Sequence, residues 1–378
     1  MGTYGYDINF LREHHVEIME LTSADGLSRI AVAPNYQGRV MTSTTGGYQG
    51  DSYGWINYKL ISSEIIDSKV NHVGGEDRFW LGPEGGMFSF YFKKGDEQNF
   101  ENWSVPKEID SERFNIYKAS SSHIVFTKNA ILLNASDNLF NIGIKRTISI
   151  LSKNYIEKLL AVRFFPDLKF IAFKSENLIT NKGAEAWTRK TGLPSIWELG
   201  MFNPTPTTTV FIPFNENSNE TVVNTDYFEK VTSDRMIIKN GIIIFKIDGA
   251  YRTKIGIPAK RAKALCGSYD TEKNVLTLVW YNLPDNPDGY VNSRWGEQED
   301  PFDGDVVNTY NDGPVADGSI MGPFYEIETS SPGASLLPGK SLKHIMIVVH
   351  VHGDKNKLDK LVRKLFAIDL DQITSCFA

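Results

Sequence analysis

The run of β-branched residues near the carboxyl end, Ile345-Met-Ile-Val-Val-His-Val-His352, limits what this chain can fold into more than any other stretch. Val and Ile are enriched in strands because their branched side chains pack well on a pleated surface. A second strand-like run precedes it at 322–332, and Leu337-Pro-Gly-Lys340 between the two supplies turn chemistry. We therefore predict a strand, a turn and a second strand that lies beside the first.

This predicted hairpin carries four ionisable side chains at strand spacing. Glu326 and Glu328 are two residues apart, as are His350 and His352. Alternate residues of a strand share one face, so each pair points to one side of the sheet. Two carboxylates and two imidazoles on adjacent strands would suit proton transfer on a polar substrate. The alternative is a salt-bridged patch on the sheet surface.

A divalent metal site built from the same four residues is a further alternative, because carboxylates and imidazoles are zinc ligands. Side chains two residues apart on a strand lie about 6.5–7 Å from each other, which is too far for all four to share one ion. We therefore predict no metal ligands and no cofactor.

Several other runs are typical of short strands separated by turns, which favours a β-sandwich. They lie at 122–127, 130–133, 140–151, 168–174 and 275–283. Residues 355–373 place apolar side chains at helical spacing and predict a closing helix packed on a sheet. No repeat or linker divides the 378 residues, so we expect one domain over 1–378.

Charge and composition exclude some classes of partner. The net charge of −6 argues against a nucleic-acid partner, and no apolar run has the length of a membrane-spanning helix. The two cysteines, Cys266 and Cys376, imply no disulfide framework. The amino terminus lacks an apolar signal region, so we expect a cytoplasmic protein or a periplasmic one whose signal was removed. The oligomeric state is left open.

The segment 71–92 combines many glycines with an arginine beside a tryptophan. Glycine lets the backbone approach a ligand closely, and Arg78 offers a donor fork next to the stacking face of Trp80. Glu84 follows in the same Gly-rich stretch. The segment predicts part of a binding site; the alternative is a tight aromatic β-corner.

Residues 285–314 are polar and predict a long loop of the kind in which binding residues concentrate. Its candidate ligand-binding residues are Trp295, Asn311 and Asp312. The alternative is a poorly ordered excursion.

Ile327-Glu328-Thr329 and the later Leu336-Leu-Pro-Gly-Lys340 resemble the carboxyl-terminal motif of galactose mutarotases, the aldose 1-epimerases. In that family the Glu of the motif is the general base, so the resemblance implies this role for Glu328. Asn71-His72-Val-Gly-Gly75 is similar to a His-containing stretch of the family, which implies a site role for His72. The family's second His has no counterpart, so the acid is open among His350, His72 and a protonated Glu326.

Across nearly the whole chain, longer motifs resemble a bacterial family of uncharacterised galactose-mutarotase-like proteins. They lie at 37–44, 74–86, 195–202, 308–314 and 322–332. The resemblance implies an all-β, galactose-mutarotase-like β-supersandwich with a C-terminal helix.

Together these features predict a carbohydrate-active protein with a carbohydrate ligand. The first hypothesis is an aldose 1-epimerase-like isomerase in which Glu328 removes the anomeric proton and Arg78, Trp80, Glu84, Trp295, Asn311 and Asp312 orient the sugar. The alternative is a carbohydrate-binding protein without turnover.

Overall fold

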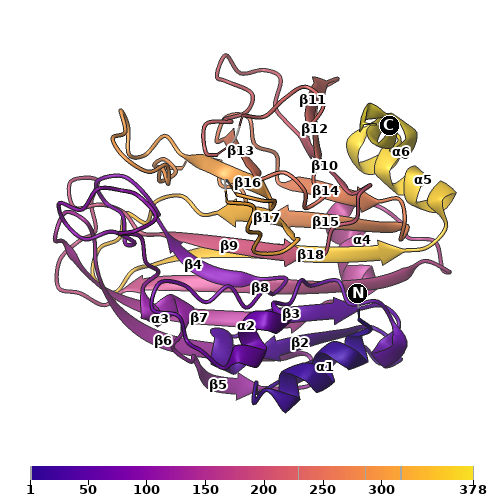
Figure 1. The fold of residues 1–378 in the computed structure, drawn as a ribbon, viewed down its shortest axis with the longest axis horizontal. Coiled ribbons are helices and arrows are strands. Elements are labelled where there is room, and N and C mark those ends of the chain that lie inside the picture. Colours follow the sequence, from indigo (N-terminus) through magenta and orange to yellow (C-terminus); the bar gives the residue numbers. More distant parts are fainter. Residues whose placement is uncertain (1, 229, 286, 316, 378) are drawn as a thin grey trace.

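Three antiparallel β-sheets form the framework of the molecule (Figure 1). The computed structural model describes residues 2–228, 230–285, 287–315 and 317–377. The largest sheet has ten strands, in the order β11-β12-β10-β14-β15-β18-β8-β7-β6-β5. Their bounds are β5 Asn115–Ala119, β6 His123–Leu133, β7 Leu139–Ile150, β8 Lys169–Asn181, β10 Thr209–Pro213, β11 Met236–Lys239, β12 Ile242–Lys246, β14 Leu265–Asp270, β15 Val275–Tyr281 and β18 Ser341–His352.

A five-stranded sheet lies against the ten-stranded one, in the order β13-β16-β17-β9-β4. Its strands are β4 Arg78–Gly82, β9 Ser195–Phe202, β13 Thr253–Pro258, β16 Asp305–Asn311 and β17 Tyr325–Ser330. A three-stranded sheet formed by β1 Met19–Thr22, β2 Arg29–Ala33 and β3 Arg39–Thr44 lies near the amino terminus.

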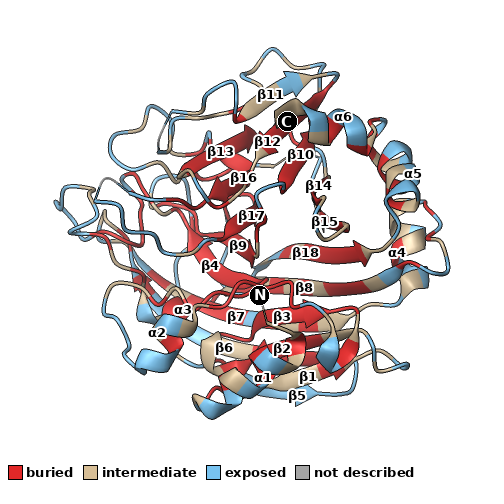
Figure 2. Ribbon diagram, turned by 45° about the vertical axis from the view of Figure 1, so that its right-hand side comes forward, coloured by how far each residue is buried: buried red, intermediate tan, exposed pale blue. Residues whose placement is uncertain are grey.

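The main hydrophobic core fills the space between the two larger sheets. Strand alternation sends Ile148 and Phe173 inward from the large sheet, and Ile196, Ile257 and Ile327 inward from the smaller one. Figure 2 shows buried residues concentrated in the strands of both sheets. The five-stranded sheet has a second face, which points away from the ten-stranded sheet, and Trp80, Trp197 and Leu199 lie on it.

The outer face of the ten-stranded sheet is covered by helices. Leu358, Leu361 and Val362 of α5 belong to a second core with residues of that sheet, and Phe366 packs on Phe211 with ring centroids 4.8 Å apart. The helices are α1 Tyr4–Glu13, α2 Tyr58–Ser63, α3 Lys107–Asp110, α4 Lys153–Leu160, α5 Lys355–Phe366 and α6 Leu370–Thr374, with 3-10 turns at Pro34–Tyr36, Gly47–Gln49 and Ser375–Phe377.

The predicted closing helix over 355–373 is two helices. Its apolar spacing is correct, but Ala367 adopts a left-handed conformation with φ 56° and ends α5. Asp369 then starts α6 with a capping box, in which its side chain and that of Gln372 each bind the other's backbone N–H.

The predicted hairpin at 322–352 is wrong in its pairing, although both strands are present. β17 pairs with β9 and β16, whereas β18 pairs with β8 and β15 in the other sheet. The turn at 337–340 therefore leads the chain from one sheet to the other. The long loop predicted over 285–314 is also wrong in part, because residues 305–311 form β16, an interior strand of the five-stranded sheet.

A buried ion cluster joins the two larger sheets. The guanidinium of Arg146, on β7, lies 2.7 Å from an Asp77 carboxylate oxygen and 3.5 Å from a carboxylate oxygen of Glu198 on β9. It also donates to Ser175 and Asn177. Burial and the neighbouring Asp77 raise the pKa of Glu198 well above its ordinary value, so a proton on Glu198 leaves one carboxylate facing one guanidinium.

We expect Arg146→Met to lower the free energy of unfolding by roughly 3–5 kcal/mol, because it leaves the Asp77 carboxylate buried without its cation. Urea unfolding followed by circular dichroism measures this. Arg163→Met is the matched control: Arg163 pairs with Glu157, but its side chain is 88% exposed, and the change should stay within about 0.5 kcal/mol. Equal losses in the two variants would contradict the structural role of the cluster.

Candidate functional site

The candidate site is a cavity of about 120 Å³ on the face of the five-stranded sheet that points away from the main core, and we call it the inner cavity. Along β9, Trp197 and Leu199 line it, while Ile196 is in the core between the sheets. It is lined by His72, Arg78, Trp80, Glu84, Phe100, Trp103, Trp197, Leu199, Phe228, Arg252, Lys254, Trp295, Tyr310, Met321, Phe324 and Glu326.

Strand register brings the charged residues together from distant parts of the sequence. Lys254 on β13 lies opposite Tyr310 on β16, and Tyr310 lies opposite Glu326 on β17. In the next row, Glu328 lies opposite Leu199 of β9, which lies opposite Arg78 of β4. Paired residues on one face lie about 4.5–5.5 Å apart, so these side chains converge on one spot.

Glu328 is fully enclosed beneath the inner cavity. Its side chain has 0% exposure, and one carboxylate oxygen accepts hydrogen bonds from Lys254 Nζ at 2.8 Å and Trp197 Nε1 at 2.9 Å. The other oxygen, Oε1, has no hydrogen-bond partner among the described residues. Burial lowers the pKa of Lys254, but Glu328 and Glu84 outweigh burial and the net shift is upward, so the ammonium stays charged.

Glu326 lines the cavity and lies in different surroundings. Its Oε1 accepts from Arg78 Nη2 at 3.1 Å, and the Arg78 guanidinium stacks over the Trp80 ring at 3.9 Å. Burial raises the pKa of Glu326 to about 8, the Glu328 charge adds to the rise, and Arg78 opposes it. Although the pair is within ion-pair distance, we infer that Glu326 is mostly protonated at neutral pH and accepts from Arg78 as a neutral acid.

The numbers of cationic and carboxyl groups around the cavity indicate that one of the carboxyl groups carries a proton. Three cations face four carboxyl groups: Arg78, Arg252 and Lys254 against Glu84, Glu326, Glu328 and Asp312. If all were ionised, a net negative charge would be buried, which costs free energy unless a proton neutralises it. Burial raises the pKa of Glu84 and of Asp312 as well, so the proton has three possible carriers, of which Glu326 is the one whose pKa reaches about 8.

Aromatic rings form the walls and rim of the cavity. Trp80 and Trp197 meet edge to face at 5.6 Å, and Trp103 and Trp295 stack at 6.2 Å. Phe100 at the rim is 63% exposed. Exposed aromatic rings beside buried charges are typical of ligand sites, because the rings give up contact with water when a ligand covers them.

The structure brings some predicted site residues together and separates others. Glu326, His72, Arg78, Trp80, Glu84 and Trp295 line the inner cavity, and Glu328 lies against it through Lys254. Burial and the nearby Arg78 lower the pKa of His72 to about 3, so its ring is neutral; its Nδ1 lies 3.4 Å from Arg78 Nη1.

His350, Asn311 and Asp312 do not line the inner cavity. His350 lies between the sheets, where its Nε2 is 3.0 Å from Glu76 and its ring stacks on Tyr53. Asn311 points to the opposite side of β16 and donates to the Tyr251 carbonyl. Asp312 accepts a hydrogen bond from the Tyr310 hydroxyl at 3.0 Å, so it positions a cavity residue.

The four-residue metal site does not form, because Glu326 and Glu328 lie on a different sheet from His350 and His352. In the part of the chain that the structure describes, no group of three or more His, Cys, Asp or Glu is arranged to hold a metal ion.

Sequence analysis missed three functional candidates, Lys254, Arg252 and Tyr310. Arg252 and Lys254 are two residues apart with Thr253 between them, which is a strand signal for one polar face. Gly256 and Pro258 of β13 are residue types that are unfavourable within strands, which weakens this signal in the sequence.

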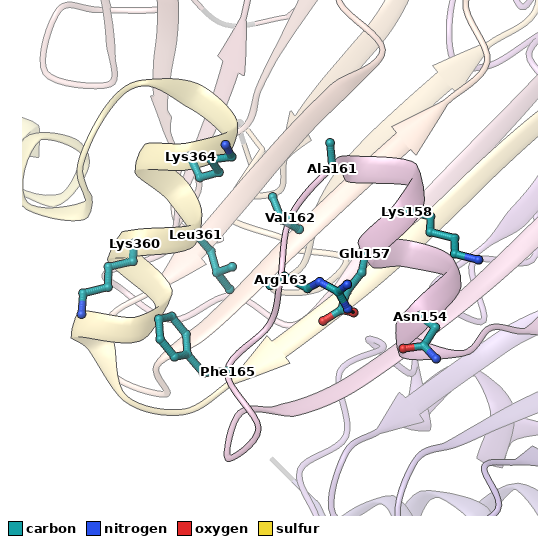
Figure 3. A pocket seen from close by; sticks show the side chains of 10 residues that line it. All are labelled: Asn154, Glu157, Lys158, Ala161, Val162, Arg163, Phe165, Lys360, Leu361 and Lys364. Atoms are coloured by element: carbon teal, nitrogen blue, oxygen red, sulfur yellow. Dashed lines mark hydrogen bonds and ion pairs between the residues drawn. The ribbon is translucent and has the colours of Figure 1, made fainter.

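Another cavity, of about 780 Å³, lies between α4 and the segment after it on one side and α5 on the other (Figure 3). Its charged lining consists of Glu157, paired with Arg163, and of Lys158, Lys360 and Lys364. None of the predicted site residues lies in it, and it is on the opposite side of the ten-stranded sheet from the inner cavity.

Comparison with protein families gives one match, a "Family of unknown function (DUF6786)", over residues 2–377. The chain belongs to this family. Membership in DUF6786 agrees with the resemblance found in the sequence, and it lends no activity. No curated protein matches the chain.

Solved structures similar to this DUF6786 protein share its fold at very low identity. The Slr1438 protein of Synechocystis sp. PCC 6803 is 9% identical, with a TM-score of 0.51 over 89% of this chain and 96% of that one. A candidate aldose 1-epimerase of Escherichia coli K12 is 10% identical, with a TM-score of 0.50 over 89% and 99%. A galactose mutarotase-like protein of Lactobacillus casei ATCC 334 is 10% identical, with a TM-score of 0.47 over 89% and 100%.

The likenesses to the Synechocystis protein and to the Escherichia coli candidate aldose 1-epimerase confirm the predicted fold: an all-β, galactose-mutarotase-like β-supersandwich with a C-terminal helix. At such identities they concern architecture alone. No helix formed by the described residues is both long and apolar enough to cross a bilayer.

We expect Glu326→Gln to flatten the pH dependence of stability between about pH 4.5 and pH 8. Because the raised pKa makes the folded state bind the proton more tightly than the unfolded state, stability falls as pH rises through this window, by up to about 1.4 kcal/mol per pH unit. Urea unfolding at several pH values measures the slope. Glu299→Gln, at an exposed position outside the cavity, should keep it; an unchanged slope in Glu326→Gln would contradict the assignment.

Proposed function

We propose that this protein is carbohydrate-active and binds one sugar ring in the inner cavity. The observation that carries the proposal is the combination of aromatic walls with buried hydrogen-bonding charges on one face of the five-stranded sheet. Aromatic faces pack against the apolar C–H faces of a sugar, while carboxyl and guanidinium groups bind its hydroxyls. The volume of about 120 Å³ lies below the ~300–1,000 Å³ typical of drug-sized ligands, so it suits a single small polar group such as a sugar ring.

The chemistry that the site supports best is proton transfer of the aldose 1-epimerase type. The Glu328 carboxylate takes the proton of the anomeric hydroxyl, and neutral Glu326 gives its proton to the ring oxygen as the bond from the anomeric carbon to that oxygen breaks. Rotation of the open aldehyde and return of both protons closes the ring as either anomer, so the two carboxyl groups end as they began. Each positioned transfer contributes roughly 10²–10⁴-fold.

The surroundings of the two carboxyl groups support these separate roles. The Lys254 ammonium and the Trp197 N–H both donate to one oxygen of Glu328, and the other, Oε1, has no hydrogen-bond partner among the described residues. Arg78 lies where it would stabilise the Glu326 carboxylate that forms when the proton leaves. Where two nearby carboxyl groups lie in different surroundings, the group with the raised pKa, here Glu326, is assigned as the acid and the other as the base.

Other residues orient the sugar in this proposal. Trp80 and Trp295 offer ring faces, Glu84 accepts hydroxyl hydrogen bonds, and neutral His72 offers a further polar contact beside Arg78. His350 has no part, because it lies on the far side of the five-stranded sheet. Similarity in fold to a candidate aldose 1-epimerase supports the proposal as an analogy.

We expect Glu328→Gln to lose at least about 100-fold in the rate of anomer interconversion above the spontaneous rate, because glutamine cannot take the proton. Polarimetry with freshly dissolved α-D-glucose and α-D-galactose measures the rate. Tryptophan fluorescence measures sugar binding, which should persist because an amide still accepts from Trp197. Glu299→Gln should behave as the unchanged protein; an unchanged rate in Glu328→Gln would end the assignment of the base.

The rate should also fall as pH rises through about 8. Because burial raises the pKa of Glu326, the acid is protonated below this value and loses its proton above it. Interconversion followed between pH 5 and pH 10, after subtraction of the spontaneous rate, gives the profile. A rate that rises steadily through pH 8 would contradict a neutral Glu326.

One observation favours a second function, carbohydrate binding without turnover. Glu328 has 0% exposure and is held by Lys254 and Trp197, as in a purely structural ion pair. In that case sugars quench tryptophan fluorescence saturably while the anomer ratio relaxes only at its spontaneous rate.

A further inference from the structure

A second hollow of about 760 Å³ adjoins the inner cavity, and we call it the outer groove. Met321 lines both spaces. The outer groove is lined by Gly2, Asp7, Ser52, Trp55, Ile56, Asn57, Tyr58, Lys59, Leu60, Ser63, Asn203, Pro204, Ile320, Met321, Gly322 and Pro323.

Strand alternation places both spaces on the same face of the five-stranded sheet. Along β9 the residues of this face are Trp197 and Leu199, which line the inner cavity, then Met201, then Asn203, which lines the outer groove. In β17 and the residues before it, Glu326 and Phe324 line the inner cavity and Gly322 lines the outer groove. The two spaces therefore follow one another along the strand direction.

A thin aromatic wall separates them. Trp55, Met201, Tyr310 and Phe324 form a small buried cluster, in which the Trp55 and Phe324 rings lie 4.7 Å apart. Phe324 faces the inner cavity and Trp55 faces the outer groove. Met321 stands at the edge of this wall and is partly exposed, so a ligand that passes over it would touch both spaces.

The outer groove is mostly uncharged. Its lining includes the rings of Trp55 and Tyr58 and the amides of Asn57 and Asn203, of which Asn57 Oδ1 and Asn203 Nδ2 already bind backbone groups. Of its acidic and basic residues, Asp7 is buried, and burial raises its pKa. Lys59 is then the main charge, which is too little for a phosphate or a polyanion. Rings with neutral hydrogen-bonding groups match further sugar residues.

We propose that the ligand is a neutral oligosaccharide, with one ring in the inner cavity and the next in the outer groove. This rests on the proposed function of the inner cavity and extends it by the size of the substrate. A free monosaccharide would occupy only the inner space, so affinity rises with chain length.

Isothermal titration calorimetry with D-glucose, maltose and maltotriose, and with D-galactose and a β-1,4-linked galactobiose and galactotriose, tests the proposal. We expect at least one disaccharide to bind roughly tenfold more tightly than its monosaccharide, the factor that one good aromatic contact supplies. Ser63→Trp fills the outer groove and should abolish this gain. Ser62→Trp places the same ring on the neighbouring exposed residue, which lies outside the groove, and should keep it.

The outcomes separate the two proposals. Monosaccharides and disaccharides of equal affinity, or a gain that survives Ser63→Trp, would overturn the outer groove as a subsite and leave sugar binding in the inner cavity standing. Heats of binding that are absent for every sugar, with unchanged tryptophan fluorescence, would overturn both. A gain lost in Ser63→Trp and kept in Ser62→Trp supports both.

Discussion

The contact on which the site depends is the buried guanidinium of Arg146 between the two larger sheets. It binds Asp77, the residue before β4, and lies 3.5 Å from Glu198 in the middle of β9. Each partner is next in sequence to a residue of the inner cavity, Arg78 and Trp197 respectively. Successive strand residues point to opposite faces of the sheet. Holding Asp77 and Glu198 on the core side therefore also positions Arg78 and Trp197 on the cavity side. A buried cation with several hydrogen bonds tolerates little displacement, so it sets the register of β4 against β9.

The same alternation explains how one thin sheet carries charges on both faces. On the core side, one guanidinium meets two carboxyl groups, and a proton on Glu198 balances them. On the cavity side, three cations meet four carboxyl groups, and one proton again balances the set. Neither cluster can lose one of its charged members without leaving an unpaired charge in a medium of low dielectric constant. The core cluster holds the two larger sheets together. The cavity cluster instead includes a carboxyl group with a raised pKa that lines the inner cavity.

Sequence reasoning predicted the β-sheet fold correctly, and it failed on the pairing of the last two strands. Alternation and β-branched residues defined β17 and β18, but the turn between them looked like a hairpin although it crosses between sheets. Local turn chemistry gives no information on which sheet the next strand joins. β16 was missed because its Asp and Asn residues are unfavourable in strands by propensity, although its Val, Thr and Tyr residues favour them. The sequence did not indicate a role for Lys254, because that role depends on contact with Glu328, which lies 74 residues away in the chain.

The chemistry of Glu326 and Glu328 follows from their neighbours more than from their identity. Both are buried glutamates on one strand face, two residues apart. A lysine ammonium and an indole N–H converge on one oxygen of Glu328. Glu326 has one guanidinium contact and a carboxylate neighbour, and burial then favours its neutral form. Exchanging the contacts of the two residues would exchange their protonation. Lys254 and Trp197, which bind Glu328, come from strands β13 and β9 on either side of the β16–β17 pair.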